Sequence, residues 1–134
     1  MERSPQLTEL LNRIYTAVSN GDAATLSSVL SAHDGLLFIG TDPEEWFEDA
    51  DSIRAMLTAQ ASAGIKVEGG DVVAYEEGTV GWVADRGHFL LPDGVRVPFR
   101  ISAVFHRESG RWALVQEHAS IAMTNDDALV VGLS

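Results

Sequence analysis

The sequence predicts an α+β domain, cone-shaped, in which three amino-terminal helices pack on a strongly curved antiparallel sheet made of a four-stranded meander plus a short early strand. Two observations predict this class. The first half of the chain has apolar residues at helical spacing, and the second half has long β-rich segments between turn signals. A chain of 134 residues can bury one core, so we expect a single domain over residues 1–134.

The composition narrows the choice of partners. Acidic residues outnumber basic residues by 20 to 9, the formal charge is -11, and no Lys/Arg cluster could neutralise phosphates. No apolar run approaches the roughly 20 residues that a membrane-spanning helix needs. Cysteine is absent, and the start of the chain lacks the apolar segment of a signal peptide. We therefore expect a soluble, cytoplasmic protein that binds neither nucleic acid nor membranes.

The first predicted helix begins at Ser4 and Pro5, a favoured N-cap followed by a favoured first helical residue. Asn20-Gly21 ends it. Between these limits the apolar residues form one stripe at three- and four-residue spacing. They are Leu7, Leu10, Leu11, Ile14 and Val18.

Two further helices and a short strand are expected before residue 65. Asp22 can cap the second, shorter helix. The apolar run 36–39 is too short for a helix and predicts a buried strand. The third helix begins near Asp49 or Asp51 and stops at Gly64, and Gln60 lies on its apolar face.

From residue 65 onward, β-rich segments alternate with three turn signals. These are Glu76-Glu77-Gly78, Pro92-Asp93-Gly94 and Glu108-Ser109-Gly110. The three turns predict a four-stranded meander. Their equal spacing gives the strands between them about 13 residues and a length of roughly 40 Å, and strands of this length must twist and bend. A meander that curls around helices leaves a hollow that a ligand could enter.

The last hairpin decides which polar side chains meet. A three-residue loop at 108–110 places Arg100 opposite His118 and Ser102 opposite Gln116, so polar groups gather on one face. A two-residue turn shifts this register by one and sends Arg100 and His118 to opposite faces. Both arrangements are open.

The alternation of side chains along the last strand predicts a pocket wall. In either register Gln116, His118 and Ser120 are expected on the same face as Trp112 and Leu114. Polar groups beside core apolar groups are typical of such a wall. A structural interpretation competes with it, since His118 and Ser120 could instead bond to backbone or lie at a subunit interface.

Asp85 stands on an otherwise apolar predicted strand. A three-residue loop at 92–94 places it opposite Ile101. Asp85 is then an acid in the pocket or the ion-pair partner of Arg100 or Arg86, and the two roles are compatible.

Several motifs resemble those of one known family. They are Asn20-Gly21-Asp22, the segment 38–46, Gly81-Trp82-Val83-Ala84-Asp85, and an ending with Arg100, Gly110-Arg111-Trp112 and His118-Ala119-Ser120. Nearly the whole chain resembles the SnoaL-like domains of the nuclear-transport-factor-2-like (NTF2-like) superfamily, which has a cystatin-like α+β fold. The resemblance implies a cone-shaped fold with a pocket between helices and sheet, and usually a homodimer packed through the outer sheet face.

The relatives implied by this resemblance have different activities. They include ketosteroid isomerases, polyketide cyclases, epoxide hydrolases, dehydratases and non-catalytic transport or assembly domains, and fold alone does not choose among them. An isomerase of this type needs a carboxylate base near the end of the first strand, where this chain has Phe38-Ile39-Gly40. Asp42, beside Pro43, is better explained as a turn cap, and Tyr15 as a buried, hydrogen-bonded tyrosine.

The leading interpretation is a small-molecule-binding SnoaL-like homodimer with an aromatic-lined pocket. Its activity is left open, and the enzyme classes considered are isomerase-, cyclase- and hydrolase-type enzymes that act on a small organic substrate. The alternative is a non-catalytic ligand-binding or dimerisation domain. A His or Asp with an Arg could move a proton and hold an oxyanion, so the catalytic candidates are His118, Asp85 and Arg100. The ligand-binding candidates are Tyr15, Trp46, Trp82, Ser102 and Gln116. The four histidines show no metal-ligand spacing, so we expect no metal and no cofactor.

Overall fold

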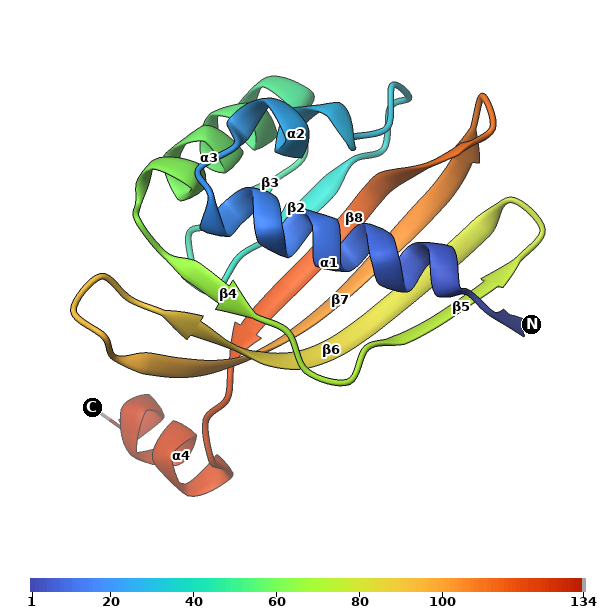
Figure 1. Ribbon diagram of the computed structural model, residues 1–134. Helices are drawn as coiled ribbons and strands as arrows, with labels where there is room; N and C mark the ends of the chain where they lie inside the picture. Colours follow the sequence, from blue (N-terminus) through green and yellow to red (C-terminus); the bar gives the residue numbers. More distant parts are fainter. Residues whose placement is uncertain (134) are drawn as a thin grey trace.

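Three helices cover the concave face of one strongly curved sheet (Figure 1). The computed structural model describes residues 1–133. The helices are α1 (Pro5–Ser19), α2 (Ala23–Ser28), α3 (Ala50–Ser62) and α4 (Asn125–Leu133). The strands are β1 (Glu2–Arg3), β2 (Leu37–Ile39), β3 (Trp46–Phe47), β4 (Lys66–Glu68), β5 (Val73–Glu77), β6 (Val80–Leu90), β7 (Arg96–Glu108) and β8 (Arg111–Ile121).

The predicted caps of the first two helices are confirmed, and Asp49, one of the two predicted starts of the third helix, caps that helix. The side chain of Ser4 accepts a hydrogen bond from the Leu7 amide at the start of α1, and Asp22 and Asp49 accept equivalent bonds at the starts of α2 and α3. The chain leaves α3 before Gly64, whose φ of +71° suits glycine. These signals are local, which is why the sequence alone predicts them.

The sheet contains the predicted meander and additional strands. Strands β5, β6, β7 and β8 pair antiparallel in that order, and no helix interrupts residues 71–121. Strand β2 adds to β8 in parallel, and β1 and β3 form the two edges. The expected count of three helices, four meander strands and one early strand is therefore incomplete, since residues 1–133 form four helices and eight strands. The extra strands β1 and β3 have two residues each, too few to leave a periodic pattern.

The first meander strand is split into β4 and β5, which both pair with β6. Residues 69–72 loop out between them. The Gly70 amide donates a hydrogen bond to Asp85 of β6, with N and Oδ2 3.1 Å apart. A Cβ on Gly70 would collide with the carbonyl oxygen of Arg86, so the close approach of the two backbones requires glycine.

The β6–β7 hairpin has the register expected for a three-residue loop, with Asp85 opposite Ile101. The β7–β8 hairpin instead has the two-residue turn Ser109-Gly110, in which both residues have positive φ and Glu108 pairs with Arg111. The second of the two open registers is therefore the one that forms near the turn.

A β-bulge at Val115 then changes the faces of β8. Phe105 pairs with Leu114 but Val104 pairs with Gln116, which leaves Val115 as an extra residue. The expectation that Gln116, His118 and Ser120 share a face with Trp112 and Leu114 is wrong, because strict alternation fails at this bulge. Beyond it, Glu117 and Ala119 face the helices, and Gln116, His118 and Ser120 face outward.

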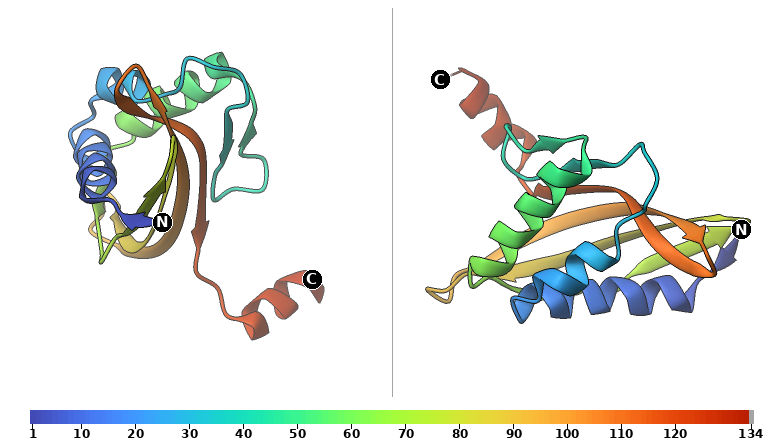
Figure 2. Two further views of the ribbon diagram at one scale, coloured as in Figure 1. Left: turned by 90° about the vertical axis from the view of Figure 1, so that its right-hand side faces the viewer. Right: turned by 90° about the horizontal axis from the view of Figure 1, so that it is seen from above.

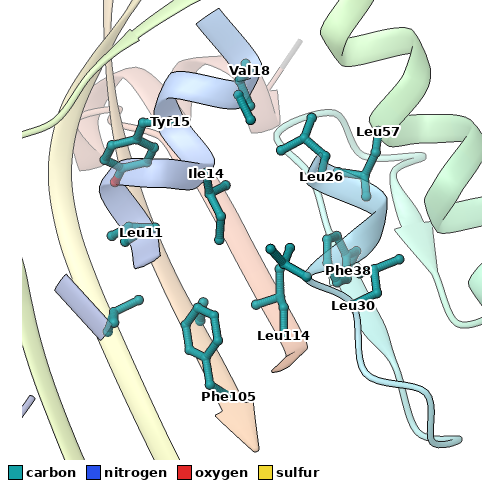
Figure 3. Close-up of a cluster of buried hydrophobic side chains, with 14 of the residues drawn as sticks. Leu11, Ile14, Tyr15, Val18, Leu26, Leu30, Phe38, Leu57, Phe105 and Leu114 are labelled. Atoms are coloured by element: carbon teal, nitrogen blue, oxygen red, sulfur yellow. The ribbon is translucent and has the colours of Figure 1, made fainter. Parts of the chain in front are cut away.

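The core lies between the helices and the concave face. Leu11, Ile14 and Val18 of α1 belong to one buried cluster with Phe105 and Leu114 of the sheet, and Ile14 points toward the sheet (Figure 3). Helix α4 instead projects from the end of β8, away from the rest of the molecule (Figure 2). Within residues 1–133 no helix has the length and apolar character needed to cross a bilayer.

Candidate functional site

A cavity of about 470 Å³ lies between α3 and the concave sheet face, near the end of β8. This volume is within the range of small-molecule sites. Most of its wall is apolar, formed by Phe38, Ile39, Met56, Ala59, Ile65, Phe89, Leu91, Val97, Ala119 and Ile121. The polar side chains in the wall are those of Thr41, Glu45, Gln60 and Glu117.

A smaller chamber of about 50 Å³ adjoins this cavity on the side of α1. Tyr15 lines the small chamber, together with apolar residues of α1, α2 and the sheet. Gln60, Phe89, Glu117 and Ala119 line both spaces. The two spaces are therefore neighbouring parts of one hollow, with Glu117 and Gln60 at their junction.

Glu117 is the ionisable group at this junction. Its position on β8, after the bulge, directs the side chain between helices and sheet. Burial is the one influence on its pKa, and among the described residues no hydrogen bond or ion pair reaches its carboxyl. Burial among apolar neighbours raises the pKa of Glu117 from 4.5 to about 7. Near neutral pH this carboxyl can therefore both give and accept a proton.

Tyr15 and Asp85 form a buried pair beside the small chamber. The Tyr15 hydroxyl donates to Asp85 Oδ2 at 2.7 Å. Asp85 also accepts from the amides of Gly70 at 3.1 Å and Arg86 at 2.8 Å. Burial, reinforced by the hydrogen bond to Asp85 and by its charge, raises the pKa of Tyr15 above its usual value, so this hydroxyl stays protonated.

This pair corrects one expectation and confirms another. Asp85 bonds to a tyrosine and to backbone amides, and among residues 1–133 it forms no ion pair with Arg86 or Arg100. Tyr15 is buried and hydrogen-bonded, as expected.

The remaining candidates lie outside the hollow. Arg100, Ser102, Gln116 and His118 do come together, with Ser102 opposite His118, but on the exposed convex face of the sheet. Phe99 and Ala103 of β7 are buried, so alternation along β7 turns Arg100 and Ser102 outward. The bulge at Val115 then turns Gln116 and His118 of β8 to the same side.

The two tryptophans among the candidates also lie elsewhere. Trp82 lies on the convex face and stacks on Tyr75 with ring centroids 6.4 Å apart. Trp46 belongs to the edge strand β3, where it is 58% exposed and donates to Glu48. Neither contributes to the wall of the cavity.

Sequence reasoning missed Glu117 as a site residue. Regular alternation from Trp112 instead predicts that Gln116 and His118, the neighbours of Glu117, point inward. One usable signal was Gln60, a polar residue on the apolar face of the third predicted helix. Such a residue is typical of a helix that faces a cavity as well as a core.

Comparison with known proteins agrees with this architecture. A structurally similar protein is a proposed dehydratase of the NTF2-like family from Streptomyces avermitilis, with 20% identity, a TM-score of 0.80, and coverage of 89% of this chain and 95% of that chain. An NTF2-like protein of unknown function from Pseudomonas putida has 14% identity and a TM-score of 0.78, covering 90% and 87%. A proposed ketosteroid isomerase from Shewanella frigidimarina has 12% identity and a TM-score of 0.70, covering 84% and 92%.

Identities this low show the fold alone. No curated protein matches the chain in sequence. The sequence does match the SnoaL-like domain family over residues 7–124, which is most of its length. The chain therefore belongs to the SnoaL-like domain family and has its NTF2-like, cystatin-like fold.

Proposed function

We propose that the hollow binds a small, largely apolar organic molecule and that Glu117 exchanges a proton with it as a general acid or base. The observation that carries this proposal is an unpartnered carboxyl with a pKa of about 7 in the wall of an apolar cavity of about 470 Å³. A group whose pKa lies near the working pH is suited to proton transfer in either direction.

The residues around the cavity would contact different parts of the ligand. Apolar side chains of α3, β6 and β8 would bury the body of the ligand. The Gln60 amide, which lines both spaces beside Glu117, can donate a hydrogen bond to a carbonyl or hydroxyl oxygen. Tyr15 shapes the inner wall, and its own proton stays on the hydrogen bond to Asp85.

The reaction class that fits is proton abstraction or elimination next to a carbonyl. The similar structures proposed to be a dehydratase and a ketosteroid isomerase bear names of this type, which supports the class. The isomerase arrangement itself does not fit, because the cavity has Phe38, Ile39 and Gly40 where that arrangement needs a carboxylate. In this chain the carboxyl comes from β8 instead.

The test begins with small cyclic ketones, enones and β-hydroxy ketones, screened for those that raise the melting temperature. Those that do are incubated with the protein in D₂O, and deuterium uptake next to the carbonyl is followed by mass spectrometry. We expect Glu117→Gln to lower the exchange rate by about 100-fold or more while it still binds the ligand. Glu9→Gln, which removes an exposed charge on α1, is the matched control and should exchange like the wild type.

Unchanged exchange in Glu117→Gln would refute the catalytic role. Stabilisation by a ligand without any exchange would favour the alternative, a non-catalytic binding or dimerisation domain. Homodimerisation through the outer sheet face stays a prediction, and light scattering that reports only the 14.4 kDa chain would exclude it.

A further inference from the structure

Three side chains with metal-binding atoms meet where β7 turns into β8. Figure 1 shows this turn at one end of the long strands, and the cavity lies near their other end. His106 and Glu108 lie two residues apart on β7, and His33 comes from the loop after α2. His106 Nδ1 is 3.0 Å from Glu108 Oε2, and His33 Nε2 is 4.0 Å from Glu108 Oε1. The three ligand atoms all lie within 4.8 Å of one another.

We propose that His33, His106 and Glu108 bind one divalent transition-metal ion, with Zn²⁺ as the representative. Two imidazole nitrogens with one carboxylate oxygen suit Zn²⁺ and its neighbours in the first transition row, whereas Mg²⁺ and Ca²⁺ prefer oxygen ligands throughout. The set was invisible in the sequence, because His33 and His106 are far apart along the chain.

The distances are short enough for such a site. A tetrahedral ion with ligands at about 2.0–2.1 Å holds them roughly 3.4 Å apart. The His106–Glu108 separation is already below this, and the His33–Glu108 separation is slightly above it. The His33 side chain is 70% exposed, so a change of rotamer can bring its nitrogen closer without disturbing the core.

Glu108 is held in place before any ion arrives. Its side chain is only 10% exposed, and it accepts hydrogen bonds from the Ser31 hydroxyl at 2.5 Å and from the Ala32 amide at 3.3 Å. The loop that carries these donors is tied to β8, since the Ser31 amide donates to the Leu114 carbonyl. A carboxylate has about four acceptor positions, so two remain for a metal ion and a second contact. Such outer hydrogen bonds orient a ligand and strengthen its hold on the ion.

The site has room for a further ligand. A hollow of about 360 Å³ adjoins the cluster, lined also by Asp34, Val80, Val104 and Val115. Three protein ligands beside an open space leave the fourth position of a tetrahedral ion to water or to an external donor. The formal charge of -11 also raises the local concentration of cations.

The test is a calorimetric titration of the full chain with Zn²⁺ in excess Mg²⁺, which occupies weak carboxylate sites on the acidic surface. We expect one Zn²⁺ per chain. His33→Gln and His106→Gln should each weaken binding by about 100-fold or more, because even the loss of an outer-shell partner typically costs 10- to 100-fold. His118→Gln removes an exposed histidine on the convex face and should bind Zn²⁺ like the wild type.

A second readout separates ligand loss from loss of fold. Because His33 is exposed, the melting temperature of metal-free His33→Gln should equal that of the wild type. Co²⁺ bound by two imidazoles and a carboxylate should give visible absorption bands in the wild type that are absent in His106→Gln. The proposal is overturned if the wild type binds no stoichiometric Zn²⁺, or if either histidine variant, correctly folded, keeps wild-type affinity.

Discussion

Glu117 carries a free-energy cost that depends on pH. The carboxyl lies between helices and sheet without a hydrogen-bonding partner in residues 1–133, and its pKa rises to about 7. Proteins rarely leave a charge in such surroundings unless it has a use. Tyr15 and Asp85 show the opposite arrangement nearby, since the Asp85 carboxylate accepts three hydrogen bonds. The two acids therefore differ in their partners. The Asp85 carboxylate is fully hydrogen-bonded, whereas the Glu117 carboxyl is available to a ligand in the cavity.

This difference predicts how stability varies with pH. The folded state holds the Glu117 proton more tightly than the unfolded state, in which the pKa is near 4.5. Below pH 4.5 both states are protonated and the group costs nothing. As pH rises through 4.5 to 7 the unfolded state ionises first, so folding loses stability, by no more than about 3 kcal/mol because the carboxyl touches an open cavity.

The measurement is urea unfolding of the wild type and Glu117→Gln at pH 5 and pH 8. As the pH rises from 5 to 8, the free energy of unfolding of Glu117→Gln should increase relative to that of the wild type. Above pH 8 the difference between the two free energies should stay constant. Glu9→Gln should show no such trend. A gap that is the same at both pH values would mean that Glu117 is not buried as described.

Some elements of the fold are determined by interactions within a few residues, and others by contacts between distant parts of the chain. Caps at Ser4, Asp22 and Asp49 and the turn glycines act within a few residues, so the helices and the meander could be predicted from the sequence. The bulge in β8 could not, because Leu114-Val115 continues an ordinary apolar strand pattern. The strand itself could therefore be predicted, but the one extra residue at the bulge reverses which later residues of β8 face the cavity.

The break between β4 and β5 gives a prediction at the same scale. Gly70 lies against the backbone of β6, and a methyl group there would meet the Arg86 carbonyl, which cannot move without breaking the sheet. Gly70→Ala should therefore lower the free energy of unfolding by about 1–3 kcal/mol. It should also weaken ligand binding, because the Gly70 amide helps to hold Asp85 and hence Tyr15 in the wall.

The matched control for this substitution is Gly132→Ala. That glycine lies on α4 with open space around it, so alanine should leave stability unchanged or raise it slightly. Urea unfolding of both variants gives the comparison. Equal stabilities for the two variants would show that the strands can separate at Gly70 without cost.

On the scale of the whole molecule, the cavity and the histidine cluster lie at opposite ends of the long strands. Val97 of β7 lines the cavity, and His106 and Glu108 of the same strand belong to the cluster. Within the part of the chain that the structure describes, no side chain lines both the cavity and the hollow beside the cluster. Binding at one place should therefore leave affinity at the other unchanged, which makes the two proposals separable in one protein.

Helix α4 buries little apolar surface against the rest of the molecule. Its apolar residues Leu129 and Val130 are 65% and 67% exposed, and its backbone leaves the sheet after Ile121 (Figure 2). Apolar burial is the main source of stability, so a helix that buries so little should add little to the fold. Removing residues 124–134 should therefore change the melting temperature by no more than about 2 °C.

Calorimetric melting of the shortened and full chains makes the comparison, with the Zn²⁺ titration and the ligand-induced rise in melting temperature as checks on the two sites. Both sites should keep their affinities, since none of the described residues after Ile121 lines the cavity or joins the histidine cluster. A drop of more than about 5 °C would mean that α4 packs on the sheet in solution, because a fall of that size corresponds to roughly 1 kcal/mol or more in a domain of this length. The exposed Leu129 and Val130 would then belong to the core rather than to an appended segment.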